Sequence, residues 1–232
     1  MRFIARLFLA VGTCVSLVSG CQDIPGKNRE ASPVPGIDLS HFQGDVNFKE
    51  IAGSGNRFVF LKASEGAKYT DTKFAANWKA AKDAGLIRGA YHFLHPTVDG
   101  AAQARHFLSV VDLAPGDLPP VVDVERAKGN SNAGLADTLK GFLDEVRKTT
   151  GVDAIIYVSP AFWKEHLQEH ITAPLSNPLW IAEYGVNTPR ELKHLPPWTF
   201  WQYTNTGSSA GVKGHVDLDY GRNIEAIRIR KN

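Results

Sequence analysis

The chain has 232 residues, enough to bury the core of one domain, and 43% of them are hydrophobic. Its 26 Lys and Arg against 24 Asp and Glu give a formal net charge of +2. This balance argues against nucleic acid or an anionic membrane surface as partner, because both are recognised through a basic excess. The eight His and two Cys show no zinc-like spacing, so we expect no metal site and no cofactor.

The first twenty residues have the features of an export signal. Arg2 and Arg6 precede an apolar run over 7–18, which is too short and wrongly flanked for a membrane-spanning helix. The run ends in Val18-Ser19-Gly20-Cys21, which resembles the lipobox of bacterial lipoproteins, where the cysteine is lipidated and becomes the first residue. We therefore expect residues 1–20 to be removed and Cys21 to be acylated.

After this processing the chain is expected to begin with a tether. Residues 21–35 combine the lipidated cysteine with a stretch rich in Pro, Gly and polar side chains, before a domain over 36–232. Cys14 leaves with the signal, so no internal disulfide can form. Gln22 is not the aspartate associated with inner-membrane retention, so in a Gram-negative host we expect an outer-membrane lipoprotein facing the periplasm. Secretion is the alternative.

The domain alternates short apolar runs with helical patterns. Strands are predicted at Val34–Asp38, Phe58–Lys62, Ile87–Phe93, Val121–Glu125, Ala154–Val158, Leu179–Glu183 and Thr199–Tyr203. Between them, Phe74, Trp78 and Ala81 recur at helical spacing before Gly85, and Trp78 is expected in the core. Leu135, Leu139, Phe142 and Val146 recur likewise before Gly151.

Repeated strand, helix and strand units predict parallel strands with right-handed crossovers. The fold class expected is α/β, as a single irregular, TIM-like β/α barrel, with a doubly wound open sheet as the alternative. After about residue 171 helical patterns thin out while Pro and aromatic residues increase. Short or missing helices are therefore predicted in the last third of the barrel.

Two carboxylates, Asp123 and Glu125, end the fourth predicted strand. Side chains alternate across a strand, so both should point the same way, about 6–7 Å apart along the backbone. Two negative charges at that range repel, so one should hold its proton towards neutral pH. A protonated acid beside an ionised carboxylate is what cleavage of a glycosidic bond requires. On its own, however, an Asp-x-Glu tripeptide more often caps a strand in water.

Further acids have a similar place in the chain. Asp38 ends the first predicted strand, and Asp217 lies near the end of the sequence. In a barrel the carboxyl ends of the strands converge on one face, where catalytic residues gather. We therefore expect Asp38 and Asp217 to share a pocket with the Asp-x-Glu pair. Asp219 is expected only to cap a turn.

Seven sequence blocks in this order resemble the family 25 glycoside hydrolases, the Chalaropsis-type lysozymes. They are Gly36-Ile-Asp-Leu-Ser-His-Phe-Gln-Gly44, Lys62-Ala-Ser-Glu-Gly66, Gly89-Ala-Tyr-His-Phe93, Val122-Asp-Val-Glu125, Trp180-Ile-Ala-Glu-Tyr184, Trp201-Gln-Tyr203 and Val216-Asp-Leu218. The similarity spans about Pro35 to Tyr220, with Phe42 where many members have Trp. It implies an irregular β/α barrel that cleaves peptidoglycan glycan strands between N-acetylmuramic acid and N-acetylglucosamine. We expect the protein to be a monomer.

By this resemblance Glu125 is the general acid, and Asp123, Asp38 and Asp217 are supporting acids. Asp123 should stay ionised and stabilise positive charge at the anomeric carbon. It would also orient the 2-acetamido group of the sugar if that group is the nucleophile, which gives retention, the outcome we expect. The alternative is inversion through a water held by Asp38 or Asp217, which needs carboxylates about 6.5–9.5 Å apart.

Aromatic and amide side chains near strand ends are the candidates for binding sugar. They are Tyr91, Tyr157, Tyr184, Trp201, Gln202 and Tyr203. Trp201 and Tyr203 alternate with Gln202 along one strand, so only one of these two sets can line the pocket. Lys62 and His92 are expected to pack or to support the site indirectly.

Three other functions fit the sequence less well. A family 18 chitinase would show Asp-x-x-Asp-x-Asp-x-Glu ending at Glu125, but Leu118 and Val121 occupy the first two acidic positions. A catalytically inactive peptidoglycan-binding lipoprotein should have lost an acid, yet all four are present. A secreted antibacterial enzyme conflicts with the lipobox. The sequence therefore predicts an active N-acetylmuramidase.

Overall fold

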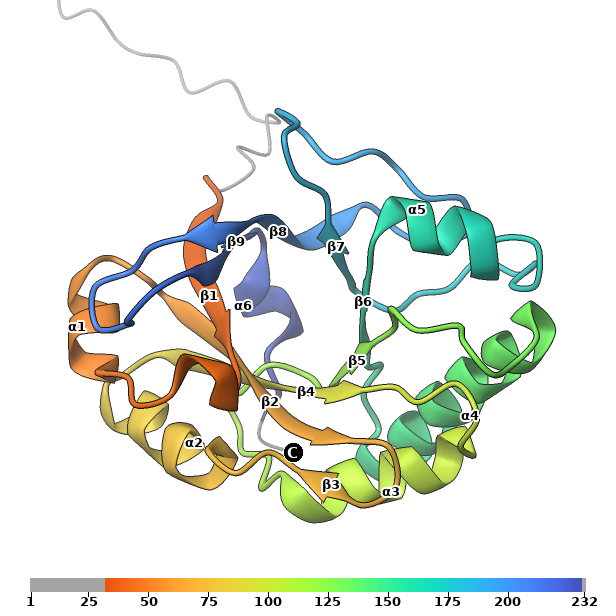
Figure 1. Cartoon of the computed structure of the whole chain (residues 1–232), viewed down its shortest axis with the longest axis horizontal. Helices are drawn as coiled ribbons and strands as arrows, with labels where there is room; N and C mark the ends of the chain where they lie inside the picture. Colours follow the sequence, from red (N-terminus) through yellow and green to blue (C-terminus); the bar gives the residue numbers. More distant parts are fainter. Residues whose placement is uncertain (1–31, 231–232) are drawn as a thin grey trace, which may run out of the picture.

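Eight strands close into a barrel in the computed structural model, which describes residues 32–230 (Figure 1). They are β1 (Val34–Leu39), β2 (Phe58–Glu65), β4 (Ile87–Phe93), β5 (Val121–Asp123), β6 (Ile155–Val158), β7 (Leu179–Ala182), β8 (Trp198–Gly207) and β9 (Val216–Gly221). The order is β1-β9-β8-β7-β6-β5-β4-β2, and pairing of β1 with β2 closes the ring. This closure confirms the α/β barrel and excludes the open sheet. The short β3 (Tyr69–Thr70) pairs with β2 outside the ring.

The last strand runs against its neighbours. All other neighbouring pairs in the ring are parallel, whereas β9 is antiparallel to both β8 and β1. The sequence did not predict β9 as a strand. Because it runs in the opposite direction, its first residues lie at the same end of the barrel as the carboxyl ends of the parallel strands.

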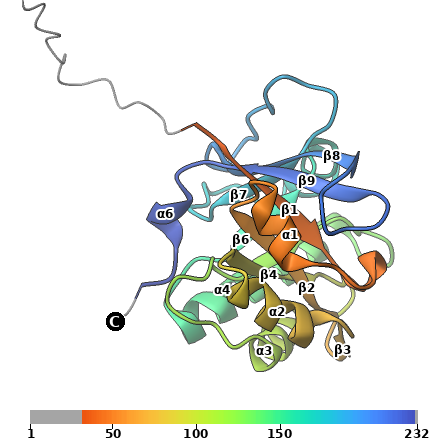
Figure 2. The same cartoon turned by 90° about the vertical axis from the view of Figure 1, so that its left-hand side faces the viewer.

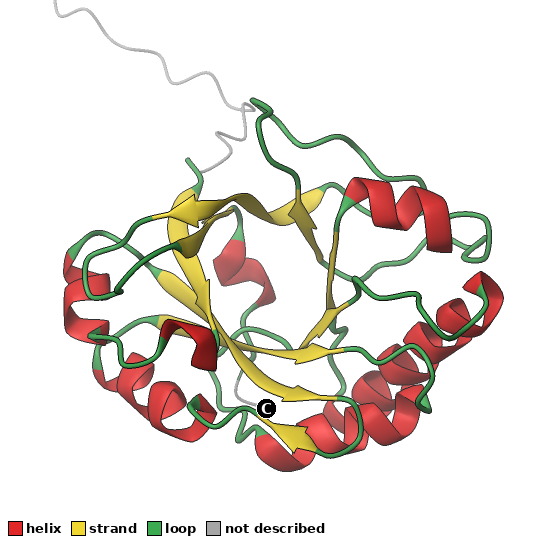
Figure 3. Cartoon of the chain, viewed as in Figure 1, coloured by secondary structure: helices red, strands yellow, loops and turns green. Residues whose placement is uncertain are grey.

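Helices cover the barrel unevenly. They are α1 (Phe48–Gly53), α2 (Phe74–Asp83), α3 (Gly100–Val110), α4 (Asn132–Thr150), α5 (Pro160–Phe162) and α6 (Ile224–Ile227), with a 3-10 turn η1 (His41–Gln43) and a π-helical turn η2 (Trp163–Leu167). Figures 2 and 3 show β8 and β9 without a helix over them, while α1 to α4 lie outside the other strands. The predicted loss of helices in the last third is confirmed.

The two predicted helices are confirmed as α2 and α4. Each is followed by a glycine in a left-handed conformation, Gly85 at φ 78° and Gly151 at φ 75°. Trp78 is buried in the core, as expected. Within 32–230, no helix combines the length and apolar character needed to span a membrane. Cys21 and the expected signal and tether up to residue 31 lie outside the described residues.

Inward-facing side chains change from apolar to polar along the strands. The apolar layer contains Gly36, Phe60, Gly89, Val121, Ile155 and Phe200, and two residues later come Asp38, Lys62, Tyr91, Asp123, Tyr157 and Gln202. The apolar layer is tightly filled: a Cβ on Gly89 would lie 2.4 Å from the ring of Phe60. Because aromatic rings plug the barrel below, the polar layer becomes the floor of a cavity at the carboxyl ends of the parallel strands.

Candidate active site

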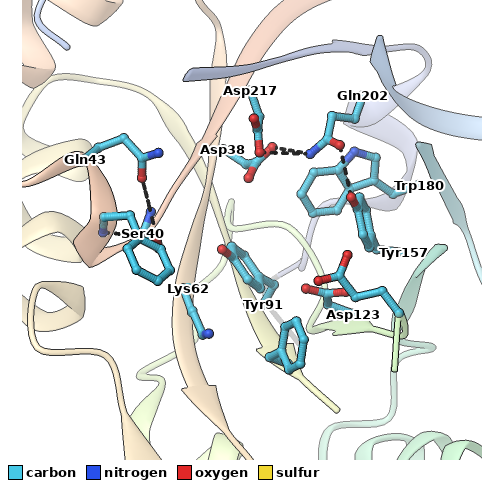
Figure 4. A pocket seen from close by; sticks show the side chains of 13 residues that line it. Asp38, Ser40, Gln43, Lys62, Tyr91, Asp123, Tyr157, Trp180, Gln202 and Asp217 are labelled. Atoms are coloured by element: carbon cyan, nitrogen blue, oxygen red, sulfur yellow. Dashed lines mark hydrogen bonds between the residues drawn. The ribbon is translucent and has the colours of Figure 1, made fainter. Parts of the chain in front are cut away.

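One cavity collects residues from all eight strands of the barrel and from the η1 turn (Figure 4). Its lining is Asp38, Ser40, Phe42, Gln43, Lys62, Tyr91, Phe93, Asp123, Glu125, Tyr157, Trp180, Gln202 and Asp217. All four predicted acids are therefore present in one place. Within 32–230, no group of three or more His, Cys, Asp or Glu is arranged to hold a metal ion.

Asp123 and Glu125 line the same wall, as strand alternation predicts. Strand β5 ends at Asp123, so Glu125 extends from the segment just beyond it. Asp123 is only 7% exposed, and its Oδ1 is buried without a hydrogen-bond partner in the described part of the chain. Burial raises the pKa of Asp123 well above its usual value, and repulsion from Glu125 adds to the rise.

Glu125 is exposed as a whole residue because it lies at the rim, while its side chain takes part in the cavity wall. Burial of the side chain raises the pKa of Glu125, against the opposing positive charges of Arg126 and Lys62. The negative charge of Asp217 adds to the rise. Two neighbouring carboxyls that both favour protonation behave as a coupled pair, which can hold one proton at a pH where a free carboxylate has none.

Asp38, Asp217 and Asp219 form a second acidic group on the opposite wall. Antiparallel pairing places Asp38 directly across from Asp217 at the start of β9. Asp217 therefore reaches the cavity from the beginning of an antiparallel strand, not from the carboxyl end of a parallel one. Burial raises the pKa of Asp38 well above its usual value, and the charges of Asp219 and Asp217 raise it further.

The expectation that Asp219 only caps a turn is wrong. Asp219 is fully buried inside β9, where its Oδ1 accepts a hydrogen bond of 2.8 Å from Trp180 Nε1 and its Oδ2 has no partner among residues 32–230. Burial raises the pKa of Asp219 well above its usual value. The alternation Asp-Leu-Asp over 217–219 was the sequence signal for this placement, because it puts both acids on one face of a strand.

Gln202 connects the acids with the tyrosines. Its Nε2 donates to Asp38 Oδ2 at 2.7 Å and to Asp217 Oδ2 at 3.4 Å, and its Oε1 accepts from the Tyr157 hydroxyl at 3.0 Å. The Tyr184 hydroxyl donates to the same oxygen. Gln202 is therefore the member of its strand that faces the cavity, at 2% exposure.

Trp201 and Tyr203 do not line this cavity, so of the two alternating sets it is Gln202 that faces it. They lie on the outer face of β8, where the Tyr203 ring stacks on Tyr220 at 4.6 Å and Trp201 Nε1 donates to the Glu183 carbonyl oxygen at 2.7 Å. The reason is the alternation itself: once Gln202 points inward, both neighbours point outward.

The remaining predicted residues divide by position. Tyr91 and Tyr157 are in the lining, and Tyr184 reaches it through its bond to Gln202. Sequence analysis missed Trp180, whose ring stacks on Phe60 at 4.2 Å below the cavity. It also assigned Lys62 an indirect role, although Lys62 lines the cavity; a lysine two positions after an inward phenylalanine was the available signal.

Comparisons with known proteins agree with this geometry. A model described as "Glycosyl hydrolases family 25" matches residues 37–212. Lysozyme M1 of Streptomyces globisporus is 36% identical over 222 residues, covering 90% of this chain and 76% of that protein. The N,O-diacetylmuramidase of Chalaropsis sp. is 33% identical, covering 79% and 96%. The crystal structure of a bacterial lysozyme from Streptomyces coelicolor superposes with a TM-score of 0.78 at 34% identity, covering 85% and 95%.

Proposed function

Since the chain belongs to the family 25 glycosyl hydrolases, and is thus a lysozyme-type glycoside hydrolase, we propose that it is an N-acetylmuramidase. It hydrolyses peptidoglycan at the β-1,4 bond from N-acetylmuramic acid to N-acetylglucosamine. The observation that carries this proposal is the pair Asp123 and Glu125 in one cavity with Asp38 and Asp217. The names of the relatives, lysozyme and N,O-diacetylmuramidase, support the same substrate.

Glu125 is the general acid of the proposed reaction. It lies at the rim, where a glycosidic oxygen of a bound strand can reach it, and its raised pKa favours the protonated form that a general acid needs. Protonation of the leaving oxygen allows the bond to the anomeric carbon to break while positive charge develops on the sugar.

Asp123 is the orienting carboxylate. Its unpartnered, buried Oδ1 is an acceptor that an N-acetyl N–H group of the substrate can satisfy. That hydrogen bond stabilises the ionised form of Asp123 and leaves the shared proton of the pair on Glu125. The acetamido oxygen then attacks the anomeric carbon, and water later opens the resulting ring with retention of configuration.

Asp38, Asp217 and Gln202 complete the proposed site. Gln202 holds the two carboxyls beside each other, and both face the region where positive charge develops. The ionised member of this pair stabilises that transition state through its negative charge. If Asp38 or Asp217 instead activates water for direct attack, the product has inverted configuration.

We further propose that the enzyme works as a monomer, anchored through acylated Cys21 to the outer membrane and facing the periplasm. The lipobox and Gln22 support this location. Two or three acyl chains are needed for stable attachment, because a single chain binds a membrane only weakly.

Mass spectrometry of products from purified peptidoglycan tests the function. Fragments with a reducing-end muramic acid are expected. Anhydro-muramic acid would indicate a lytic transglycosylase, and binding without any fragments would indicate an inactive peptidoglycan-binding lipoprotein. NMR of the newly formed anomeric centre separates retention from inversion.

A further inference from the structure

A second hollow lies beside the catalytic cavity. It is lined by Glu65, Gly66, Ala67, Lys68, Tyr69, His95 and Val98, and it encloses about 560 Å³. Its lining combines the apolar side chains of Ala67 and Val98 and the ring of Tyr69 with the charged or polar side chains of Glu65, Lys68 and His95. This mixture suits a group that has both an aliphatic part and charged ends.

Lys62 and Phe93 connect the hollow to the catalytic cavity. Both line the cavity, and Lys62 Nζ lies 2.8 Å from Glu65 Oε2 in the hollow. The Phe93 ring has Lys62 Nζ 4.8 Å from its centre and the Arg126 guanidinium 4.5 Å from its centre. Arg126 directly follows Glu125, so the hollow adjoins the part of the cavity that contains the general acid.

Positive and negative side chains meet at this junction. The Glu65 carboxylate receives Lys62 on one oxygen, and both His95 at 3.1 Å and Arg126 at 3.2 Å on the other. Glu65 therefore faces two permanent cations, which it shares with the neighbouring Glu125. Lys68, exposed in the same hollow, has no ion-pair partner within 32–230. The Arg126 side chain is 52% exposed, so its remaining N–H groups are free to bind an anion.

The catalytic cavity itself is acidic, so it repels anionic substituents of a substrate. An unmodified N-acetylated glycan is neutral, but muramic acid bears a lactyl ether to which a stem peptide with carboxylates is attached. The hollow is larger than a lactyl group alone requires. The combination of aliphatic wall and exposed cations fits the peptide.

We propose that this hollow, together with Arg126, binds the stem peptide of a muramic acid residue through its carboxylates. The proposal rests on the proposed muramidase function and adds a determinant of substrate choice: peptide-bearing glycan is bound more tightly than bare glycan. Arg126 and Lys68 supply the recognition, and Glu65 fixes Arg126 and Lys62 in place.

Binding measured in a Glu125→Gln background tests the inference independently of turnover. Calorimetry would compare a peptide-bearing glycan tetrasaccharide, the same fragment after amidase has removed the peptides, and the peptide-bearing fragment with its peptide carboxylates amidated. We expect about fivefold tighter binding of the first, the size of one partly exposed ion pair. Amidase treatment leaves the lactyl carboxylate, so it separates the two sources of negative charge.

Adding Lys68→Gln should remove most of this preference while leaving the affinity for bare glycan unchanged, and Lys140→Gln on α4 serves as the matched control. Adding Arg126→Gln as well should remove the rest. Equal affinities for the three fragments, or equal weakening of bare and peptide-bearing glycan by Lys68→Gln, would overturn the inference. If the tight binding persists after amidase treatment, it comes from the lactyl group, and this result would overturn the inference as well. Wild-type turnover on the bare fragment reports separately on the proposed function.

Discussion

Gln202 Nε2 donates a 2.7 Å hydrogen bond to Asp38 Oδ2, although the two residues are 164 positions apart in the chain. The oxygen of the same amide, Oε1, accepts a hydrogen bond from the Tyr157 hydroxyl. One buried side chain thus links an acid on β1 with a phenol on β6.

Gln202→Leu should destabilise the fold and impair catalysis. The change leaves the buried Tyr157 hydroxyl without its acceptor, which costs about 1–3 kcal/mol of unfolding free energy. Urea unfolding at neutral pH measures this loss. Tyr184→Phe is the control, since Tyr184 is 44% exposed and its hydroxyl can turn to water, so less than about 1 kcal/mol is expected. Equal stability of Gln202→Leu and wild type would show that the network contributes nothing.

Glu125→Gln should lower kcat by at least about 10²-fold, because the amide cannot donate the proton that the leaving oxygen needs. Asp123→Asn should cost about 10²–10³-fold, and Asp38→Asn or Asp217→Asn less, since these act on charge from the opposite wall. Initial rates on soluble glycan fragments measure these losses. Circular dichroism and retained glycan binding provide the control for folding. A Glu125→Gln variant with wild-type rates is incompatible with the assignment.

The pH dependence of kcat/KM should respond oppositely to two substitutions. The alkaline limb reports loss of the Glu125 proton. Asp217 raises the pKa of Glu125 and Arg126 lowers it. Asp217→Asn should therefore move the limb to lower pH, and Arg126→Gln should move it to higher pH. Profiles from about pH 4 to pH 9 on bare glycan would show this, with Lys140→Gln as the variant that leaves the limb in place. Shifts of the alkaline limb in the same direction for both variants would show that this limb does not report the Glu125 proton.

Asp219→Asn should flatten the dependence of stability on pH. In the unfolded chain Asp219 ionises near its usual pKa of about 3.9, whereas burial raises the pKa in the folded state. Between these values the folded state binds the extra proton, so wild-type stability falls as pH rises. The variant keeps an acceptor for Trp180 and should be more stable by about 1 kcal/mol near pH 8, with no gain below about pH 4.

Thermal or urea unfolding from about pH 4 to pH 8 checks this expectation, because the two states differ in bound protons only above the usual carboxyl pKa. Asp144→Asn, exposed on α4, is the matched substitution and should not alter the slope. A steeper slope for Asp219→Asn than for wild type would mean that the buried Asp219 is ionised.

Cys21→Ala should release the enzyme from the membrane fraction, because acylation at the lipobox depends on the thiol. Fractionation followed by immunodetection measures the distribution, and mass spectrometry of the wild-type N-terminal peptide measures the acyl chains. Cys14→Ala is the control and should not change fractionation. Membrane association that survives Cys21→Ala would rule out the lipid anchor.

The sequence alone was sufficient for local features. The stripe of Leu135, Leu139, Phe142 and Val146 ending at Gly151 predicted α4, because a helix requires apolar residues at that spacing and a glycine that accepts the left-handed cap. The same local logic predicted that Asp123 and Glu125 share a face. Strand β9 escaped prediction because its acids and glycine have low strand propensity, and pairing on both sides overrides that preference.

Tertiary structure decided which face of each strand points inward. Alternation places Gln202 on the opposite face of the strand from Trp201 and Tyr203. Only closure of the barrel puts Gln202 against Asp38 and leaves the two aromatic residues on the outside. It also decided that Asp219 is buried, because pairing of β9 with both β8 and β1 turns this side chain into the barrel against Trp180. The residue types and their spacing thus determined the chemistry available to this protein. Long-range strand pairing, which no local pattern encodes, determined which groups meet.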